Sequence, residues 1–401
     1  MKANNKVIYL DNNATTQIDP QVLEAMLPFY KESYGNPSSI HSFGGKIKFN
    51  LEKAREQVAS FLGADHDYEV VFTASGTESD NLAILGALSY YKSKKHLVIS
   101  RVEHPAVLDL AKNLEKNGYR VTYFPVDKNG NLNLDLLKEA VKEDTALVSV
   151  MQANNETGVV FPVEEIGYFL KEKEVLFHVD AVQAAGKIPI EVKKINCDLL
   201  SISGHKFHGP KGVGVLYVKR GTKIRPIFFG GHQEKGRRPG TENVPGIVGI
   251  GKAAELAQKH LAETKQIESL RDKLEKAVLS ICKNSHLNGD PKNRVPNTTN
   301  LGFEYIEGES ILLYLDEKGI VASSGSACSS GSLEPSHVLR AMGVPFTSAH
   351  GSLRFSLSRF TTEKEIDYVL EVLPEIIDRL LNISPYWDSK NKKSKVIDMS
   401  V

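Results

Sequence analysis

The chain has 401 residues, of which 41% are hydrophobic and 25% are charged, and its 50 basic residues are nearly balanced by 49 acidic ones. A net charge of +1 argues against a nucleic acid or an anionic membrane held by bulk electrostatics, so small molecules or protein partners fit better. At about 150 residues per domain, the length predicts two or three domains.

The N-terminus and the cysteines indicate a cytoplasmic protein. The first residues are polar and lead directly into a strand-like run at Val7–Leu10, so no signal peptide is expected. No apolar run approaches the roughly 20 residues that span a bilayer, and no membrane partner is expected. Cys197, Cys282 and Cys328 are widely spaced and form no C-x-x-C pair. This argues against a disulfide framework or a protein-only zinc site and predicts a reducing compartment.

Short apolar runs alternate with amphipathic stretches from residue 69 onward. This alternation predicts a mostly parallel sheet covered by helices on both faces, with ligands at the carboxyl ends of its strands. Strands are predicted at Glu69–Phe72, His96–Ile99, Arg120–Phe124, Ala146–Met151, Leu176–Val179, Leu199–Ile202 and Val213–Val218. Helices are predicted at Glu78–Tyr91, Ala106–Asn117, Leu134–Lys142 and Val163–Lys173.

The pattern changes after Gly246, where one long helical stretch to Cys282 leads into a smaller α/β domain. Its strands are predicted near Asn300–Phe303, Val321–Ser323 and Leu353–Ser356, and its helices at Glu309–Lys318, Pro335–Met342 and Glu363–Asn382. We expect a large domain at residues 16–260, a small domain formed by 1–15 and 261–383, and a polar tail at 384–401.

Lys206 lies in a Gly-rich turn between two of the predicted strands. A lysine held among apolar walls loses solvation of its charged form, and its amine can then attack a carbonyl to form a Schiff base. Taken by itself, Lys206 is better explained as a solvated turn lysine, because single-motif predictions are often false. The residues at the other strand ends decide between the two interpretations.

Polar groups follow several strands where the sheet should expose its carboxyl ends. Thr73–Glu78 is a small-residue turn that opens a helix, which suits a phosphate or an ordinary helix cap. The others are His104, the Asn154–Asn155 pair, and Asp180 with Gln183. Together with Lys206 these groups match pyridoxal phosphate, which needs a lysine for its aldehyde, donors for its phosphate and a carboxylate for its ring nitrogen. His205 and His208 lack a convincing third ligand for a zinc hydrolase.

These residues resemble the class V aminotransferases, within fold type I of the pyridoxal phosphate enzymes, and more narrowly the cysteine desulfurases of the NifS/IscS kind. The resemblance extends over nearly the whole chain and includes Tyr9–Thr16, Gly35–Ser39, Thr77–Asn81, Glu103–His104, Asn154–Glu156, His178–Gln183, Ser203–Lys206, Arg238–Thr241, Ser323–Ser330 and Arg354–Ser356. It implies a mixed, mostly parallel seven-stranded sheet in the large domain.

The resemblance also implies roles for individual residues. Lys206 would hold the cofactor as a Schiff base, His104 would stack on its ring, Asp180 would pair with its nitrogen and Gln183 would contact its phenolic oxygen. The phosphate would be held by Gly76, Thr77, Ser203 and His205, with Thr241 arriving from the other subunit of a homodimer. Asn155 would lie beside cofactor and substrate, and Arg354 would grip the substrate carboxylate.

Cys328 lies within a run of Ser, Gly and Ala, where a thiol is not expected to be packed in a core. We expect it to take sulfur from L-cysteine as a persulfide, releasing L-alanine, and to pass the sulfur to an iron–sulfur scaffold protein. Its only contact with metal would be transient, through the persulfide, with a cluster on that partner. Cys197 and Cys282 are expected to be small apolar fillers.

Several details of the Arg237–Pro245 and Ser332–Arg340 segments are closer to the nitrogen-fixation type than to the housekeeping type. The alternatives of the same fold are a selenocysteine lyase and an aminotransferase, although an aminotransferase has no use for Cys328. The alternative that is not an enzyme is an inert sulfur-relay or assembly subunit. Intact Lys206, Asp180, His104 and Cys328 count against it.

Overall fold

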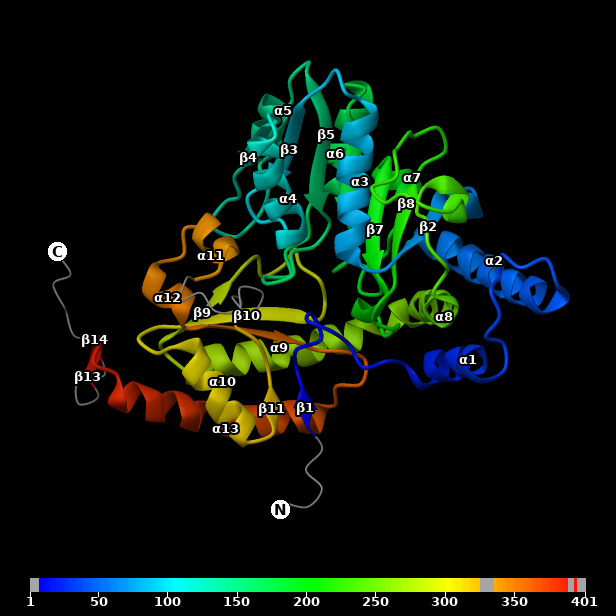
Figure 1. Ribbon diagram of the computed structural model, residues 1–401. Helices are drawn as coiled ribbons and strands as arrows, with labels where there is room; N and C mark the ends of the chain where they lie inside the picture. The colour runs from blue at the N-terminus through cyan, green and yellow to red at the C-terminus, as the bar shows by residue number, and fades with distance from the viewer. Residues whose placement is uncertain (1–6, 325–334, 389–392, 395–401) are drawn as a thin grey trace.

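The computed structural model describes residues 7–324, 335–388 and 393–394, and a seven-stranded sheet forms the centre of its larger part (Figure 1). The strand order is β2-β8-β7-β6-β5-β3-β4, and β8 runs antiparallel to β2 and β7, whereas the other neighbouring pairs are parallel. The strands are β2 (Val70–Thr73), β3 (His96–Ser100), β4 (Arg120–Phe124), β5 (Thr145–Met151), β6 (Leu176–Asp180), β7 (Leu199–Ser203) and β8 (Gly214–Val218). The predicted mixed, mostly parallel seven-stranded sheet is confirmed.

Helices cover both faces of this sheet because successive strand residues point to opposite sides. In β3, Leu97 and Ile99 belong to the core beneath α3 and α4, whereas Val98 belongs to the core on the other face, which includes residues of α2, α6 and α8. The helices of this part are α1 (Pro20–Lys31), α2 (Ser42–Leu62), α3 (Gly76–Tyr90), α4 (Pro105–Lys116), α5 (Leu134–Ala140), α6 (Val163–Glu172), α7 (Val192–Ile195) and α8 (Val244–His260).

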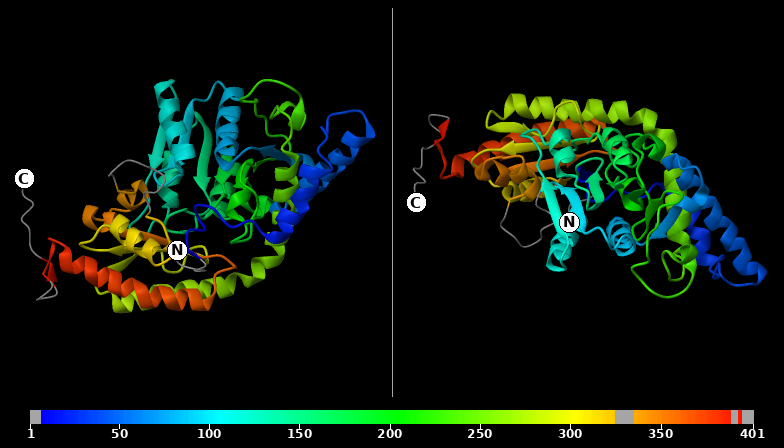
Figure 2. Two further views of the ribbon diagram at one scale, coloured as in Figure 1. Left: turned by 60° about the horizontal axis from the view of Figure 1, so that its bottom comes forward. Right: turned by 90° about the horizontal axis from the view of Figure 1, so that it is seen from above.

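A second, smaller sheet lies below the large one in the view of Figure 1 and has the antiparallel order β12-β10-β9. Its elements share a separate hydrophobic core with α9, α10 and α13, which Figure 2 shows along one side of the molecule. The elements of this part of the chain are α9 (Thr264–Ile281), β9 (Ser285–Asn288), β10 (Thr298–Phe303), α10 (Gly308–Glu317), β11 (Ile320–Val321), α11 (His337–Ala341), α12 (Phe346–His350), β12 (Ser352–Ser356), α13 (Glu363–Ile383), β13 (Trp387–Asp388) and β14 (Lys393–Ser394). The buried apolar residues of α11 and α12 belong to the core of the large sheet instead.

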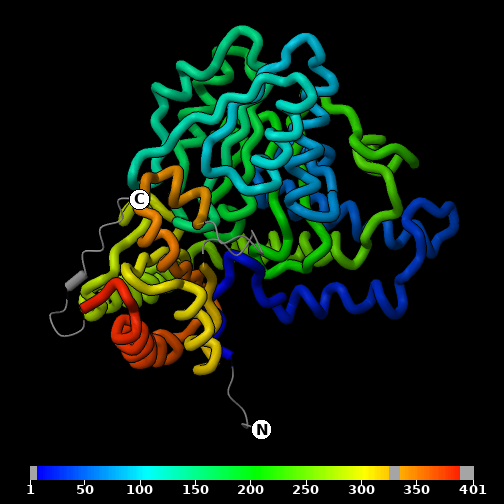
Figure 3. Tube along the Cα trace, turned by 60° about the vertical axis from the view of Figure 1, so that its left-hand side comes forward, coloured from blue at the N-terminus to red at the C-terminus, as the bar shows by residue number. Residues whose placement is uncertain are grey.

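The N-terminal segment connects the two parts of the molecule (Figure 3). Strand β1 (Ile8–Tyr9) pairs in parallel with β11, and the next residues hydrogen-bond to β12, where the Asn13 N–H donates to the hydroxyl of Ser356. The Thr16 N–H then donates to the carbonyl oxygen of His205, in the loop after β7. The segment at residues 11–16 is therefore fixed between the small sheet and the carboxyl end of the large one.

The long helical stretch predicted between Gly246 and Cys282 is confirmed, and the structure divides it into two helices, α8 and α9, joined by a short turn at Leu261–Glu263. The turn is a 3-10 helix in which the Thr264 hydroxyl donates to the carbonyl oxygen of Leu261. The side chain of Thr264 thus competes for a backbone acceptor at the junction. The division into domains at residues 260–261 falls within this turn and stays a prediction.

The two cysteines among the described residues are both buried, as fillers should be. Burial raises the pKa of the Cys197 thiol strongly and raises that of Cys282 to about 11. The described residues include no helix that is both long and apolar enough to cross a bilayer.

Candidate active site

A cavity of about 220 Å³ opens at the carboxyl ends of the large sheet's strands. It is reached by the loops that follow β2, β3, β5, β6 and β7, so residues far apart in sequence meet there. The cavity is lined by Ser75, Gly76, Thr77, Asp80, His104, Met151, Ala153, Asn155, Asp180, Val182, Gln183, Ser203, His205 and Lys206. All the predicted cofactor residues except Thr241 are in this set.

Lys206 ends the short 3-10 turn that follows β7 and extends its amine toward the N-terminal segment. Its Nζ donates to the carbonyl oxygens of Asn13 at 2.7 Å and Ala14 at 2.8 Å. Both contacts cross about half the chain in sequence, because the N-terminal segment lies against the loop. The amine is thus held at the cavity wall by two backbone carbonyl oxygens.

Asp180 ends β6 and is buried, with its Oδ1 accepting a hydrogen bond from the Val182 N–H. Burial raises the pKa of Asp180 to about 6, whereas the Val182 N–H and the charge of Lys206 act to lower it. Close behind lies Asp80 of α3, whose pKa is raised well above its ordinary value by burial and by the charge of Asp180. Its Oδ1 has no hydrogen-bond partner among the described residues and lies 3.6 Å from Nε2 of His178.

The start of α3 forms an anion-binding end of the cavity. The Ser75 hydroxyl caps the helix by accepting from the Glu78 N–H, which leaves the N–H groups of Gly76 and Thr77 without intrahelical partners. The hydroxyl of Ser203 is buried beside them and has no partner among the described residues. A side chain at Gly76 would place its Cβ 3.0 Å from Val182 and 3.4 Å from Ser203. These groups suit a phosphate, because the donors converge and the space is kept open.

Two histidines flank the cavity in their neutral forms. His104 caps α4, and its Nδ1 accepts from the Ala106 N–H, so the neutral ring carries its proton on Nε2. Burial, with the nearby charge of Lys206, lowers the pKa of His104 to about 4. The pKa of His205 is lowered to about 4 for the same reasons, and its Nδ1 lies 3.2 Å from the hydroxyl of Thr15.

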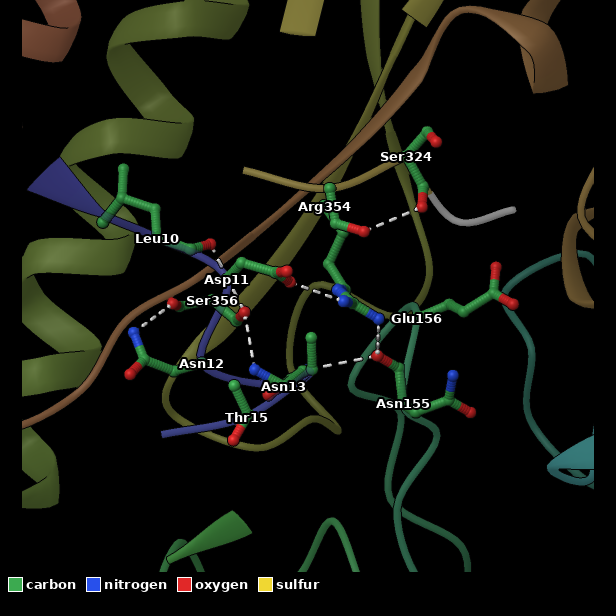
Figure 4. A network of polar contacts seen from close by, with 12 residues as sticks. Leu10, Asp11, Asn12, Asn13, Thr15, Asn155, Glu156, Ser324, Arg354 and Ser356 are labelled. Carbon is green, nitrogen blue, oxygen red and sulfur yellow. Dashed lines mark hydrogen bonds and ion pairs between the residues drawn. The ribbon is translucent and has the colours of Figure 1, made fainter. Parts of the chain in front are cut away.

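Arg354 of β12 comes from the small sheet and does not line the cavity itself (Figure 4). Its Nη2 donates to Asp11 at 2.7 Å, and its Nη1 donates to the backbone oxygen of Asn155 at 3.0 Å. The remaining donor, Nε, is buried without a partner among the described residues. Arg354 is therefore connected to the cavity through Asn155, with one N–H group left to bind a ligand.

Besides Arg354, two predicted residues are not in the cavity. Thr241 is exposed on the loop before α8, as a residue serving another subunit would be, and its role stays a prediction. Cys328 lies outside the described residues. The chain on both sides of it is fixed near the site, since Ser323 exchanges two backbone hydrogen bonds with Arg354, and Ser336 donates to the Glu156 carboxylate at 2.5 Å.

The sequence prediction missed Asp80, Asn13 and Lys187. Asp80 had a visible signal, because it is a charged residue one turn into a helix that begins at the binding edge. Asn13 lies in a motif noted above, but its contact with Lys206 depends on the path of the N-terminal segment. Lys187 follows Gln183 by one helical spacing, and its burial could not be read from the sequence.

The chain matches the family model described as aminotransferase class-V over residues 8–369, which together with the sheet and its strand-end cavity defines it as a class V aminotransferase fold. It is 59% identical to a cysteine desulfurase of Trichormus azollae and 55% identical to the cysteine desulfurase NifS of Azotobacter vinelandii, covering 95% of both chains in each comparison. The chain belongs to the cysteine desulfurase family. The predicted enzyme class, a pyridoxal-phosphate-dependent cysteine desulfurase, is confirmed.

Solved structures agree with this assignment. A NifS-like protein superposes with a TM-score of 0.88 at 43% identity, over 94% of this chain and all of that one. A structure described as SspA in complex with cysteine superposes with a TM-score of 0.78 at 36% identity, over 88% of this chain and all of that one.

Proposed function

We propose that the chain binds pyridoxal 5'-phosphate in the strand-end cavity and uses it to remove sulfur from L-cysteine, giving L-alanine and a persulfide on Cys328. The observation that carries the proposal is that Lys206, Asp180 and the start of α3 line one cavity. The similar structure that was solved with cysteine supports the choice of substrate.

The groups around the cavity fit this cofactor. The open N–H groups at the start of α3 and the unpartnered Ser203 hydroxyl supply donors for its phosphate. Asp180, which is ionised at neutral pH, would keep a proton on the ring nitrogen, and Gln183 would donate to the phenolic oxygen. Lys206 would bind the aldehyde. When bound, the cofactor supplies an electron sink for the bonds at the substrate Cα.

The residues of the chain handle the protons and the sulfur. Nζ of Lys206 takes the Cα proton of the substrate, and the Nε2 proton of His104 is the one available near the substrate thiol. Arg354 binds the substrate carboxylate through its free N–H, next to Asn155. The Cys328 thiolate forms a new S–S bond with the substrate sulfur as the C–S bond breaks. The electron pair of the broken bond stays on the carbon skeleton, whose Cβ takes up a proton. Lys206 returns the proton to Cα, and the product leaves as L-alanine.

The sulfur acceptor is an iron–sulfur scaffold protein, and the only contact of Cys328 with metal is through its persulfide and a cluster on that partner. The relative named NifS supports a role connected with nitrogen fixation. The proposed cytoplasmic location rests on the small number and wide spacing of the cysteines in the sequence. Selenocysteine lyase activity at the same site is the alternative substrate choice.

A homodimer would complete the site with Thr241 of the second copy. Large apolar side chains are exposed on α1, on α2 and on the loop before α8, among them Tyr30, Phe49 and Phe229. Figure 2 shows α1 and α2 projecting from one end of the molecule. Exposed apolar side chains at this end of the molecule would be covered by a second copy. Light scattering of the purified protein should give twice the chain mass.

Mass spectrometry after addition of L-cysteine tests the function directly. The expected result is a gain of one sulfur atom on Cys328, with L-alanine as the product and no keto acid. The Cys328→Ser variant should keep the visible cofactor band and release no sulfide from cysteine. An active enzyme should show a visible cofactor band that borohydride treatment removes, and the absence of this band would indicate the inert assembly subunit. Formation of a keto acid from cysteine would indicate an aminotransferase.

A further inference from the structure

Lys187 is a buried lysine at the edge of the cofactor site, and the mechanism above gives it no part. Only 9% of the residue is exposed, and it follows Gly186, which adopts the left-handed conformation at φ +72° and turns the chain inward. Its Nζ donates to Oδ1 of Asn13 at 2.9 Å and to Oε1 of Gln183 at 2.5 Å. A lysine is rarely buried unless its amine is needed by other groups.

The contact with Gln183 decides which end of that amide faces the cavity. A side-chain amide can be turned either way, with its oxygen and its NH₂ group exchanged. The Lys187 amine donates to Oε1 of Gln183, and this contact selects the orientation in which Oε1 points toward Lys187. The NH₂ group then points the other way, where Nε2 donates to the carbonyl oxygen of Asn13 at 2.9 Å.

The same Asn13 connects Lys187 to the Schiff-base lysine. The carbonyl oxygen of Asn13 that accepts from Gln183 also accepts from Nζ of Lys206 at 2.7 Å. The side chain of Asn13 is held at both ends, since Oδ1 accepts from Lys187 and Nδ2 donates to Thr298. Lys187 thus fixes two groups that meet beside Lys206.

The charges around Lys187 suit an uncharged donor. Lys206 and Arg354 are the cationic groups that face it, with His208 nearby, and no carboxylate pairs with it among the described residues. Burial and these two cations hold the pKa of Lys187 well below its ordinary value. A neutral amine keeps two N–H groups, which is the number that Asn13 and Gln183 accept.

We propose that Lys187 is a positioning residue that locks the Gln183 amide with its NH₂ group toward the phenolic oxygen of the cofactor, and holds Asn13 beside Lys206. The inference rests on the proposed cofactor site and adds a residue to it. Lys187 does not touch the cofactor and acts through Gln183.

A double-mutant cycle tests this assignment, using Lys187→Met, Gln183→Ala and the variant with both changes. The readouts are the position of the visible band of the loaded enzyme without substrate and the dissociation constant of pyridoxal phosphate from the reconstituted apoenzyme. Lys171→Met, on the exposed face of α6, is the matched control for loss of a lysine. A purely structural lysine would change stability without moving the band.

Lys187→Met is expected to weaken cofactor binding about fivefold to tenfold, the effect of one lost buried hydrogen bond, and to shift the band in the same direction as Gln183→Ala. The variant with both changes should be no worse than Gln183→Ala, because residues in one network are not additive. Additive effects, or a Lys187→Met enzyme with the wild-type band and affinity, would overturn the inference.

The experiment also distinguishes a variant that does not fold from one that folds, and a failure of the proposed function from a failure of the role of Lys187. Circular dichroism shows whether Lys187→Met folds. If it does not, the same cycle is run with Lys187→Gln, which leaves a polar group for the buried acceptors. The same criterion of additivity applies to that cycle. A wild-type protein that binds no pyridoxal phosphate refutes the proposed function itself. A wild-type protein that binds it normally, with an additive cycle, refutes only the role of Lys187.

Discussion

The backbone of Ser75 passes so close to Gly214 that a Cβ on Gly214 would lie 2.6 Å from the carbonyl oxygen of Ser75. Gly214 begins β8 and pairs with Thr73 at the end of β2, which places it directly against the turn that opens α3. The anion-binding end of the cavity therefore depends on the absence of a side chain in the neighbouring strand.

Gly214→Ala is expected to displace the Ser75 backbone, since a rigid backbone atom at that distance cannot be avoided by a side-chain rotation. Overpacking of this kind destabilises by about 1–3 kcal/mol. Because the start of α3 moves, the affinity for pyridoxal phosphate should also fall, by about tenfold or more, the equivalent of 1.4 kcal/mol. Thermal unfolding and a cofactor titration measure the two effects.

Gly45→Ala in α2 is the matched control for this change. Its added Cβ meets nothing within 4 Å, and alanine is favoured over glycine inside a helix by roughly 0.5–1 kcal/mol. The control should be as stable as the wild type or more so, with unchanged cofactor affinity. Equal affinity in Gly214→Ala and Gly45→Ala would contradict the assignment of the α3 turn.

Asp180→Asn tests the carboxylate behind the ring nitrogen. Asparagine keeps the acceptor for the Val182 N–H and has nearly the same volume, so the fold should be retained. The amide cannot hold a positive charge on the ring nitrogen, and turnover of cysteine should fall by about 100-fold or more, equivalent to about 2.7 kcal/mol. Cofactor content, read from the visible band, should change far less than turnover. Wild-type turnover in this variant would exclude the assigned role.

The sequence could predict the strand-end residues but not the contacts that cross the chain. Asp180 and Lys206 follow buried apolar runs, and parallel strands bring their ends to one edge, so local pattern and sheet geometry were sufficient. The Lys187 contact with Asn13 joins residues that are 174 apart, and only the path of the N-terminal segment creates it. The turn at Leu261–Glu263 also escaped prediction, because it contains no Gly or Pro to end a helix.

Arg354→Lys is expected to raise the KM for cysteine about tenfold while leaving the cofactor band in place. A lysine cannot bind Asp11 and the Asn155 oxygen in the forked geometry of a guanidinium and also offer a third donor to a carboxylate. Steady-state kinetics measure kcat and the KM for cysteine separately. A fall in kcat alone, with the wild-type KM, would assign Arg354 a structural role in the contact between the small sheet and the cavity.

The buried pair of Glu156 and Ser336 should make stability depend on pH. The Ser336 hydroxyl accepts from the Val338 and Leu339 N–H groups at the start of α11, so its own proton is donated to Glu156 Oε2 at 2.5 Å. Burial raises the pKa of Glu156 to about 7 from 4.5, whereas Ser336 and Arg354 act to lower it.

Because the folded state holds the Glu156 proton more tightly than the unfolded chain, the contribution of this group to stability is greatest below pH 4.5 and is lost as pH rises through 7. Glu156→Gln keeps an acceptor for Ser336 without a charge to bury. Relative to this variant, the wild type should lose up to about 3 kcal/mol of unfolding free energy between pH 4 and pH 8. Urea unfolding at several pH values measures the difference, with Glu139→Gln on the exposed face of α5 as the control. If the unfolding free energies of the wild type and of Glu156→Gln changed with pH in parallel, Glu156 would have the same pKa in the folded and the unfolded chain, which would contradict the prediction.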